Sequence, residues 1–149
     1  MEELTWSLKK FDDLSAAELY NILRLRSEVF VVEQNCVYLD LDNKDQDCHH
    51  LMGLMDGQLI AYTRLVPPGV SYEYPSIGRV VTSPSARRGG FGRSLMEKSI
   101  EQTKQLYGDA PIRIGAQLYL QSFYTSLGFL TSSDIYLEDG IEHIEMTRP

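Results

Sequence analysis

The feature that most constrains this chain is a glycine-rich junction between a predicted strand and a predicted helix. The strand is expected over 76–82 and ends before Pro84, and an amphipathic helix is expected from Phe91 onward. Three glycines lie at the junction: Gly89, Gly90 and Gly92. Glycine lets the backbone curl until successive amides point at one anion, and the helix N-terminus adds unpaired amides and the positive end of its dipole. The junction therefore predicts a site for a phosphate or pyrophosphate group.

Three arginines add side-chain charge at the same place: Arg87, Arg88 and Arg93. The pattern is not a Walker loop, because no Gly-Lys-Ser or Gly-Lys-Thr follows the turn. It also lacks the third glycine of the dinucleotide fingerprint. The alternative interpretation is a glycine-rich surface turn with solvated arginines.

The other predicted elements mix strands and helices. A capping box, in which Ser15 and Glu18 satisfy each other's backbone amides, begins a helix that is expected to reach Phe30. Asp56-Gly57 predicts a hairpin with a type I′ turn, because both central residues of that turn need positive φ. Further strands are expected near 5–8, 51–55, 58–66, 112–116, 131–137 and 141–147, and a last helix near 120–127.

Composition and charge weigh against several classes of protein. The chain has 149 residues, 43% of them hydrophobic, which suits one domain over 1–149 with a core of its own. A net charge of −7 weighs against a nucleic-acid partner. No apolar run approaches the roughly 18 residues that span a membrane. The N-terminal residues lack the pattern of a signal peptide, so a cytoplasmic location is expected, with Cys36 and Cys48 as free thiols.

The glycine-rich junction resembles a known motif. Arg87-x-x-Gly90-x-Gly92, after a strand and Pro84, looks like the acetyl-CoA-binding motif of the GNAT superfamily of N-acetyltransferases. The resemblance implies an enzyme that transfers an acetyl group from acetyl-CoA to a primary amine, directly and within a ternary complex. It also implies an α/β (α+β) fold, in which a mixed central β-sheet splays in the middle and carries helices on both faces.

Further segments strengthen the resemblance. The segment 122–129 is similar to the family's helix motif that ends in Tyr-x-x-x-Gly-Phe, and Gln117 lies where many members carry an asparagine. The segments 30–38 and 138–144 closely resemble the ElaA-type branch of the superfamily. This similarity runs over nearly the whole chain.

The resemblance also implies where the cofactor binds. Coenzyme A is expected in the gap of the splayed sheet, where exposed backbone groups of one strand pair with its pantetheine arm. One amide there is expected to polarise the thioester carbonyl. The residues implied in cofactor binding are Val80, Val81, Thr82, Arg87, Arg88, Gly89, Gly90, Phe91, Gly92, Arg93, Gln117 and Tyr124.

Two residues are the catalytic candidates. By the resemblance, Tyr124 hydrogen-bonds the leaving thiolate or acts as its general acid, although spacing alone would make it a core aromatic beside Phe123 and Leu127. Glu33 is the first candidate for the base that deprotonates the amine, or for positioning a water, and His143 is the second. The alternatives are a solvated carboxylate and a half-buried imidazole.

Two clusters of polar residues invite other interpretations. Cys48-His49-His50, with Cys36 upstream, suggests a metal, but the spacing matches none of the usual zinc frameworks, so no metal site is expected. The acidic residues between 33 and 47 suggest an entrance that attracts an ammonium ion, and the alternative is a solvated, solubilising loop. These acidic residues are Glu33, Asp40, Asp42, Asp45 and Asp47.

The acceptor is not identified by the sequence. A small-molecule amine and a peptide amine both fit, and a homodimer is compatible with the chain. Two other functions stay open: a non-catalytic module that senses acetyl-CoA, and a metal-binding interaction domain.

Overall fold

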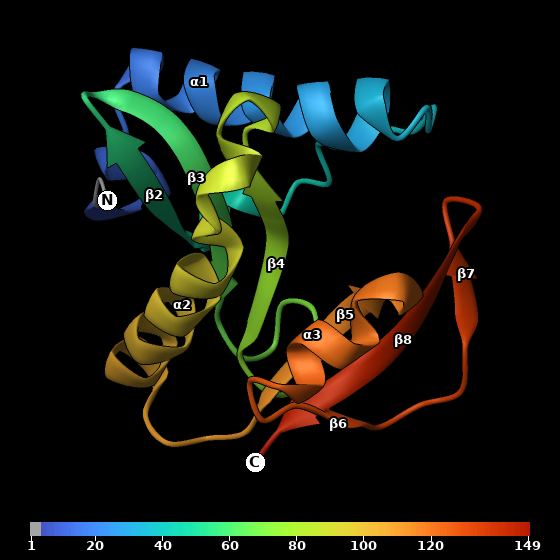
Figure 1. Cartoon of the computed structure of the whole chain (residues 1–149). Coiled ribbons are helices and arrows are strands. Elements are labelled where there is room, and N and C mark those ends of the chain that lie inside the picture. The colour runs from blue at the N-terminus through green and yellow to red at the C-terminus, as the bar shows by residue number, and fades with distance from the viewer. Residues whose placement is uncertain (1–3) are drawn as a thin grey trace.

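The computed structural model describes residues 4–149. It contains two antiparallel half-sheets, which lie beside one another in Figure 1. The first has the order β1-β2-β3-β4 and consists of β1 (Thr5–Lys10), β2 (His49–Met55), β3 (Gln58–Val66) and β4 (Ser76–Thr82). The second is built on β8 (Ile141–Arg148), which pairs with β5 (Ile112–Gln117), β6 (Leu130–Thr131) and β7 (Tyr136–Glu138). The expectation about a signal peptide rests partly on residues 1–3, which lie outside the described chain.

The two half-sheets meet where β4 and β5 begin. The N–H of Arg113 donates to the carbonyl of Pro75 at 3.0 Å, which joins the starts of the two strands. Beyond this point the green β4 and the orange β5 separate like the arms of a V (Figure 1). The expected sheet that splays in the middle is therefore confirmed.

Helices cover both faces of the first half-sheet, as expected. The covering helices are α1 (Ala16–Arg26) and α2 (Phe91–Tyr107), whereas the short α3 (Gln121–Thr125) packs beside β5 of the second half-sheet. Neighbouring residues of a strand point to opposite faces, and Met52 packs with Ile22 of α1 whereas Leu51 packs with Leu95 of α2. Within 4–149, no helix is both long and apolar enough to cross a bilayer.

Local sequence signals produce the expected local structure. The N–H of Glu18 donates to Ser15 Oγ at 3.0 Å, and the N–H of Ser15 donates to Glu18 Oε1 at 2.8 Å, which completes the capping box. Asp56 and Gly57 have φ of 51° and 77°, as a type I′ turn requires.

Two predicted boundaries are wrong. The first helix does not run to Phe30 as an α-helix, because α1 ends at Arg26 and the chain continues as a π-helical segment over Ser27–Glu33. The segment 131–137 is not one strand. Ser133 Oγ accepts the N–H of Glu145 at 2.8 Å, so a side chain replaces a backbone partner and divides β6 from β7.

Candidate functional site

A cavity of about 540 Å³ lies in the gap between β4 and β5. Its walls come from both strands, the π-helical segment, α3 and the β7–β8 hairpin. Of the residues expected at the site, the lining includes Glu33, Val80, Val81, Thr82, Arg87, Gly92, Gln117, Tyr124 and His143. The others lie beside it, on the loop that enters α2 and on the first turn of that helix: Arg88, Gly89, Gly90, Phe91 and Arg93. The structure thus brings the expected residues to one cleft and its rim.

The wall formed by β4 is irregular at Arg79. This residue has φ of 51°, in the left-handed region that non-glycine residues rarely adopt. The register between β3 and β4 shifts between Tyr62 and Arg64, which marks a bulge. A bulge takes backbone groups out of the regular ladder and re-aims them. Gly78 and Val80, on either side of Arg79, both line the cavity.

The glycine-rich loop forms a short 3-10 turn over Pro84–Gly89 and then enters α2. Gly90 caps the helix with φ of 70° and ψ of 28°, a left-handed conformation that suits glycine. A Cβ built on Gly90 or Gly92 meets no atom within 4 Å, so the space above these backbone groups is open. The first amides of α2 have no carbonyl partner within the helix, and Gly92 in its first turn lines the cavity, so this end of the helix can receive an anion.

Tyr124 belongs both to the core and to the cavity wall. Its side chain is 5% exposed and makes edge contacts with Phe123 and Phe129, whose ring centroids lie 5.2 and 5.9 Å away. Burial raises the pKa of its hydroxyl, so the hydroxyl keeps its proton at neutral pH and acts as a hydrogen-bond donor. The core and the catalytic interpretations of this residue are therefore compatible.

Glu33 reaches the cavity, but its carboxylate is engaged. Arg87 donates to Glu33 Oε2 at 2.8 Å, across the mouth between the π-helical segment and the loop. This hydrogen bond holds the pKa of Glu33 below its ordinary value. A carboxylate in this state is a weaker proton acceptor.

His143 lies on β8 at the far side of the cavity and is 6% exposed. Its Nδ1 lies 2.8 Å from the carbonyl of Ile141, and since a carbonyl oxygen only accepts, Nδ1 carries a proton and donates it there. Glu138 Oε2 lies 3.4 Å from Nε2, and the ring stacks on Tyr136. The Nδ1 hydrogen bond thus fixes the orientation of a base candidate that lines the cleft.

Sequence reasoning missed several cleft residues, among them Gln34 and Tyr38. The side-chain amides of Gln34 and Gln117 exchange hydrogen bonds at 3.4 and 3.3 Å, which links the π-helical segment to β5. Tyr38 also lines the cavity, and burial raises the pKa of its hydroxyl to about 12. The signal that could have indicated Gln34 and Tyr38 is that both lie in the segment 30–38, which carries part of the family resemblance.

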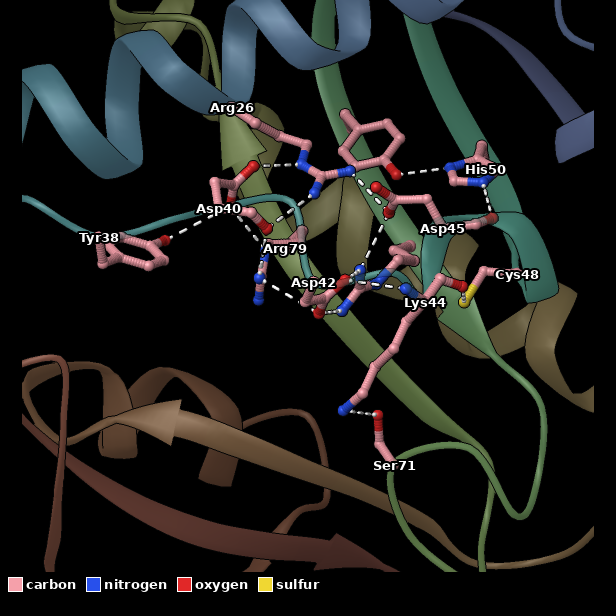
Figure 2. Close-up of polar contacts among 12 residues, drawn as sticks. Arg26, Tyr38, Asp40, Asp42, Lys44, Asp45, Cys48, His50, Ser71 and Arg79 are labelled. Atoms are coloured by element: carbon pink, nitrogen blue, oxygen red, sulfur yellow. Dashed lines mark hydrogen bonds and ion pairs between the residues drawn. The ribbon is translucent and has the colours of Figure 1, made fainter.

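The expected acidic entrance is wrong for its central residues. Figure 2 shows Asp40, Asp42 and Asp45 turned toward arginine side chains. The ion pairs join Arg26 to Asp40 and Asp45, Arg64 to Asp42 and Asp45, and Arg79 to Asp40 and Asp42. Asp40 and Asp45 are each 6% exposed. Three arginines from α1, β3 and β4 therefore balance three aspartates, and this segment offers little net charge to a substrate.

The arginines also set the ionisation of the aspartates. Burial alone would raise the pKa of Asp42 and of Asp45, but hydrogen bonds from Arg64 and Arg26 outweigh it. The pKa of each carboxyl is therefore below its ordinary value. Both aspartates stay charged inside the network at neutral pH.

The Cys-His-His segment has side-chain partners inside the fold. His50 is buried with Nδ1 2.6 Å from Tyr62 Oη and Nε2 2.9 Å from the carbonyl of Asp45, so both ring nitrogens have partners. Burial raises the pKa of the Cys48 thiol to about 11, and its Sγ lies 3.1 Å from the carbonyl of Lys44. In the part of the chain that the structure describes, no three Asp, Glu, Cys or His residues are grouped to hold a metal.

Comparison with known proteins adds three findings. The family described as "Acetyltransferase (GNAT) domain" matches residues 12–148. Protein ElaA of Escherichia coli is 41% identical over 147 residues, which cover 97% of this chain and 96% of ElaA. An acyl-CoA N-acyltransferase structure from Pseudomonas aeruginosa has a TM-score of 0.93 at 46% identity, covering 98% of this chain and 99% of that one.

A more distant neighbour shares the fold alone. N-acetylglutamate synthase from Neisseria gonorrhoeae, solved with coenzyme A and N-acetyl-glutamate, has a TM-score of 0.70 at 19% identity. The match covers 99% of this chain and 35% of the synthase.

Proposed function

Because the chain belongs to the GNAT family of acetyltransferases, we propose that it transfers an acetyl group from acetyl-CoA directly to a primary amine. The acceptor is a small molecule or a peptide. The observation that carries the proposal is the cleft between β4 and β5, which continues to the open N-terminus of α2. Acetyl-CoA supplies the activated thioester, and the groups on this chain bind it, align the amine and move protons.

The residues around the cleft fit the two ends of such a donor. Backbone groups of Val80, Val81 and Thr82 line an edge beside which an extended pantetheine arm can lie. The amides after Gly90 hold the pyrophosphate, and exposed Arg88 and Arg93 add positive charge nearby. One amide beside the bulge of β4 stabilises the charge that develops on the carbonyl oxygen.

Tyr124 stabilises the leaving thiolate. Its raised pKa keeps the phenol protonated, and an ordinary thiol has a pKa of about 8.5. Full proton transfer from the phenol to the thiolate is therefore uphill. A hydrogen bond from Tyr124 Oη to the sulfur is the role that fits.

The amine must lose a proton before it attacks, and His143 is the better-placed base. The Nδ1–H of His143 is committed to the carbonyl of Ile141, which leaves Nε2, 3.4 Å from Glu138 Oε2, as the ring nitrogen that can accept a proton. Glu33 stays a second candidate. Its carboxylate becomes a stronger base if Arg87 turns from it to a cofactor phosphate.

The proposal is tested by incubating the purified protein with acetyl-CoA and a panel of amines. The panel holds polyamines, amino sugars, aminoglycosides, amino acids and lysine peptides. We expect free thiol to appear only with certain amines, and mass spectrometry to find one added acetyl group per thiol released. Saturable acetyl-CoA binding with no product from any amine would favour the sensor module instead.

A further inference from the structure

The left-handed residue in β4 is held from outside its own strand. An L residue at φ of 51° is strained, and such a conformation persists only where surrounding contacts fix it. Arg79 Nε donates to Asp40 Oδ1 at 2.8 Å, and Arg79 Nη2 donates to the carbonyl of Asp40 at 2.9 Å. Asp40 therefore accepts two hydrogen bonds from the guanidinium (Figure 2).

Asp40 is itself fixed to the first helix. Its second carboxylate oxygen accepts Arg26 Nε at 2.8 Å, and Arg26 Nη1 donates to Asp45 Oδ1 at 2.8 Å. Arg26 is fully buried. The neighbours of Asp40, Leu39 and Leu41, are 78% and 46% exposed, so ionic contacts rather than apolar packing hold this part of the segment.

We propose that Asp40 is a positioning residue: through Arg79 it holds the bulge of β4, and so fixes the backbone groups of the strand that face the reacting thioester. This inference rests on the proposed acetyl transfer. The adjacent Gly78 and Val80 line the cavity, so a relaxed bulge would turn their peptide groups away from it. The Arg79 guanidinium is occupied by Asp40 and by Asp42, at 3.4 Å, and is not free to bind a substrate anion.

The matched pair Arg79→Gly and Arg79→Ala separates the positioning of the bulge from any direct role of the Arg79 side chain. Both variants lose the guanidinium, and both leave Asp40 with Arg26. Glycine adopts positive φ freely, whereas alanine does not. We expect Arg79→Gly to keep roughly tenfold more of the wild-type kcat than Arg79→Ala, at a similar KM for acetyl-CoA. Equal kcat in the two variants would overturn the proposal.

Asp40→Asn completes a double-mutant cycle. In the wild-type background it lowers kcat with little change in KM, because the ionic hydrogen bond to Arg79 is weakened. In the Arg79→Gly background it leaves kcat unchanged, since the bulge no longer needs an anchor. An equal loss of kcat in both backgrounds would show that Asp40 acts by another route. If Asp40→Asn does not fold, the comparison of Arg79→Gly with Arg79→Ala still tests whether the strained backbone at residue 79 needs to be held.

One readout does not depend on turnover. Backbone amide resonances over 78–81 are expected to stay near their wild-type positions in Arg79→Gly and to shift in Arg79→Ala. Wild-type protein that acetylates no amine would refute the proposed function, whereas these resonances would still report on the bulge. Amides that shift alike in both variants would refute the positioning role even in an active enzyme.

Discussion

The arginine-rich loop over 87–93 and the acidic segment over 40–47 carry opposite charge and lie in opposite environments. Arg88 and Gly90 are exposed beside the open end of α2. Asp40 and Asp45 are each 6% exposed and are paired with arginines from three distant elements. A charged segment can thus be a binding surface or an internal brace. The choice depends on partners elsewhere in the chain.

The largest expected effect lies in the cleft between β4 and β5. Tyr124→Phe keeps the ring and its packing but removes the hydroxyl that we propose bonds to the leaving thiolate. We expect kcat to fall about 10²–10⁴-fold, with a much smaller change in acetyl-CoA affinity. Single-turnover kinetics measures this, and Tyr20→Phe on exposed α1 is the control. A wild-type rate of the chemical step in Tyr124→Phe would remove the residue from the mechanism.

Asp45→Asn tests whether the acidic segment is an internal brace. The substitution leaves two buried arginines, Arg26 and Arg64, with one fewer negative charge. We expect the free energy of unfolding to drop by about 3–5 kcal/mol in urea titrations. The matched control is Asp47→Asn, two positions along on the exposed surface, with a change within about 0.5 kcal/mol. Equal losses of stability in Asp45→Asn and Asp47→Asn would show that the acidic segment is not an internal brace.

Gly90→Val and Arg88→Ala compare backbone with side chain inside the loop. A β-branched residue at φ of 70° is strained, so the amides after it move. Calorimetry should show CoA affinity about tenfold weaker in Gly90→Val. In Arg88→Ala we expect CoA affinity to be only about two- to fivefold weaker, as for the loss of one exposed charge. Equal losses would mean that side-chain charge, not the backbone, holds the pyrophosphate.

Acid should loosen the acidic segment before it affects the loop. The Asp45 pKa is lowered by Arg26 and Arg64 against the effect of burial, so the unfolded chain binds its proton first as pH falls. The stabilisation by Asp45 is full above the unfolded pKa of about 3.9 and is lost as pH falls from there toward the folded pKa. Through Asp45, the free energy of unfolding falls with pH by at most about 1.4 kcal/mol per pH unit, which is the slope expected. In Asp45→Asn this part of the slope should vanish, and an unchanged slope would assign it to other groups.

Local signals made much of the fold predictable. Asp56-Gly57, the Ser15 capping box and the glycines before α2 act within a few residues, and each produced the expected element. The predicted strand 131–137 failed because Ser133 bonds to Glu145, 12 residues away, which no local pattern reveals.

The site was predictable where a motif carries it and not where distant residues pair. The family motif placed Tyr124 and Gly92 at the cleft. The partners of Asp40 and Asp42 lie 14 to 39 residues away in sequence. The local sequence therefore predicted an open acidic entrance instead of an internal network. The contact between Glu33 and Arg87 spans 54 residues and is equally hidden.

Backbone hydrogen exchange with and without CoA tests the central claim most directly. The claim is that the open strand and the loop bind the cofactor, while the acidic segment supports the fold and the bulge of β4 without touching the cofactor. We predict that CoA slows exchange at amides 80–82 and 87–92 and leaves amides 40–47 unchanged. Protection over 40–47 with none over 87–92 would contradict it.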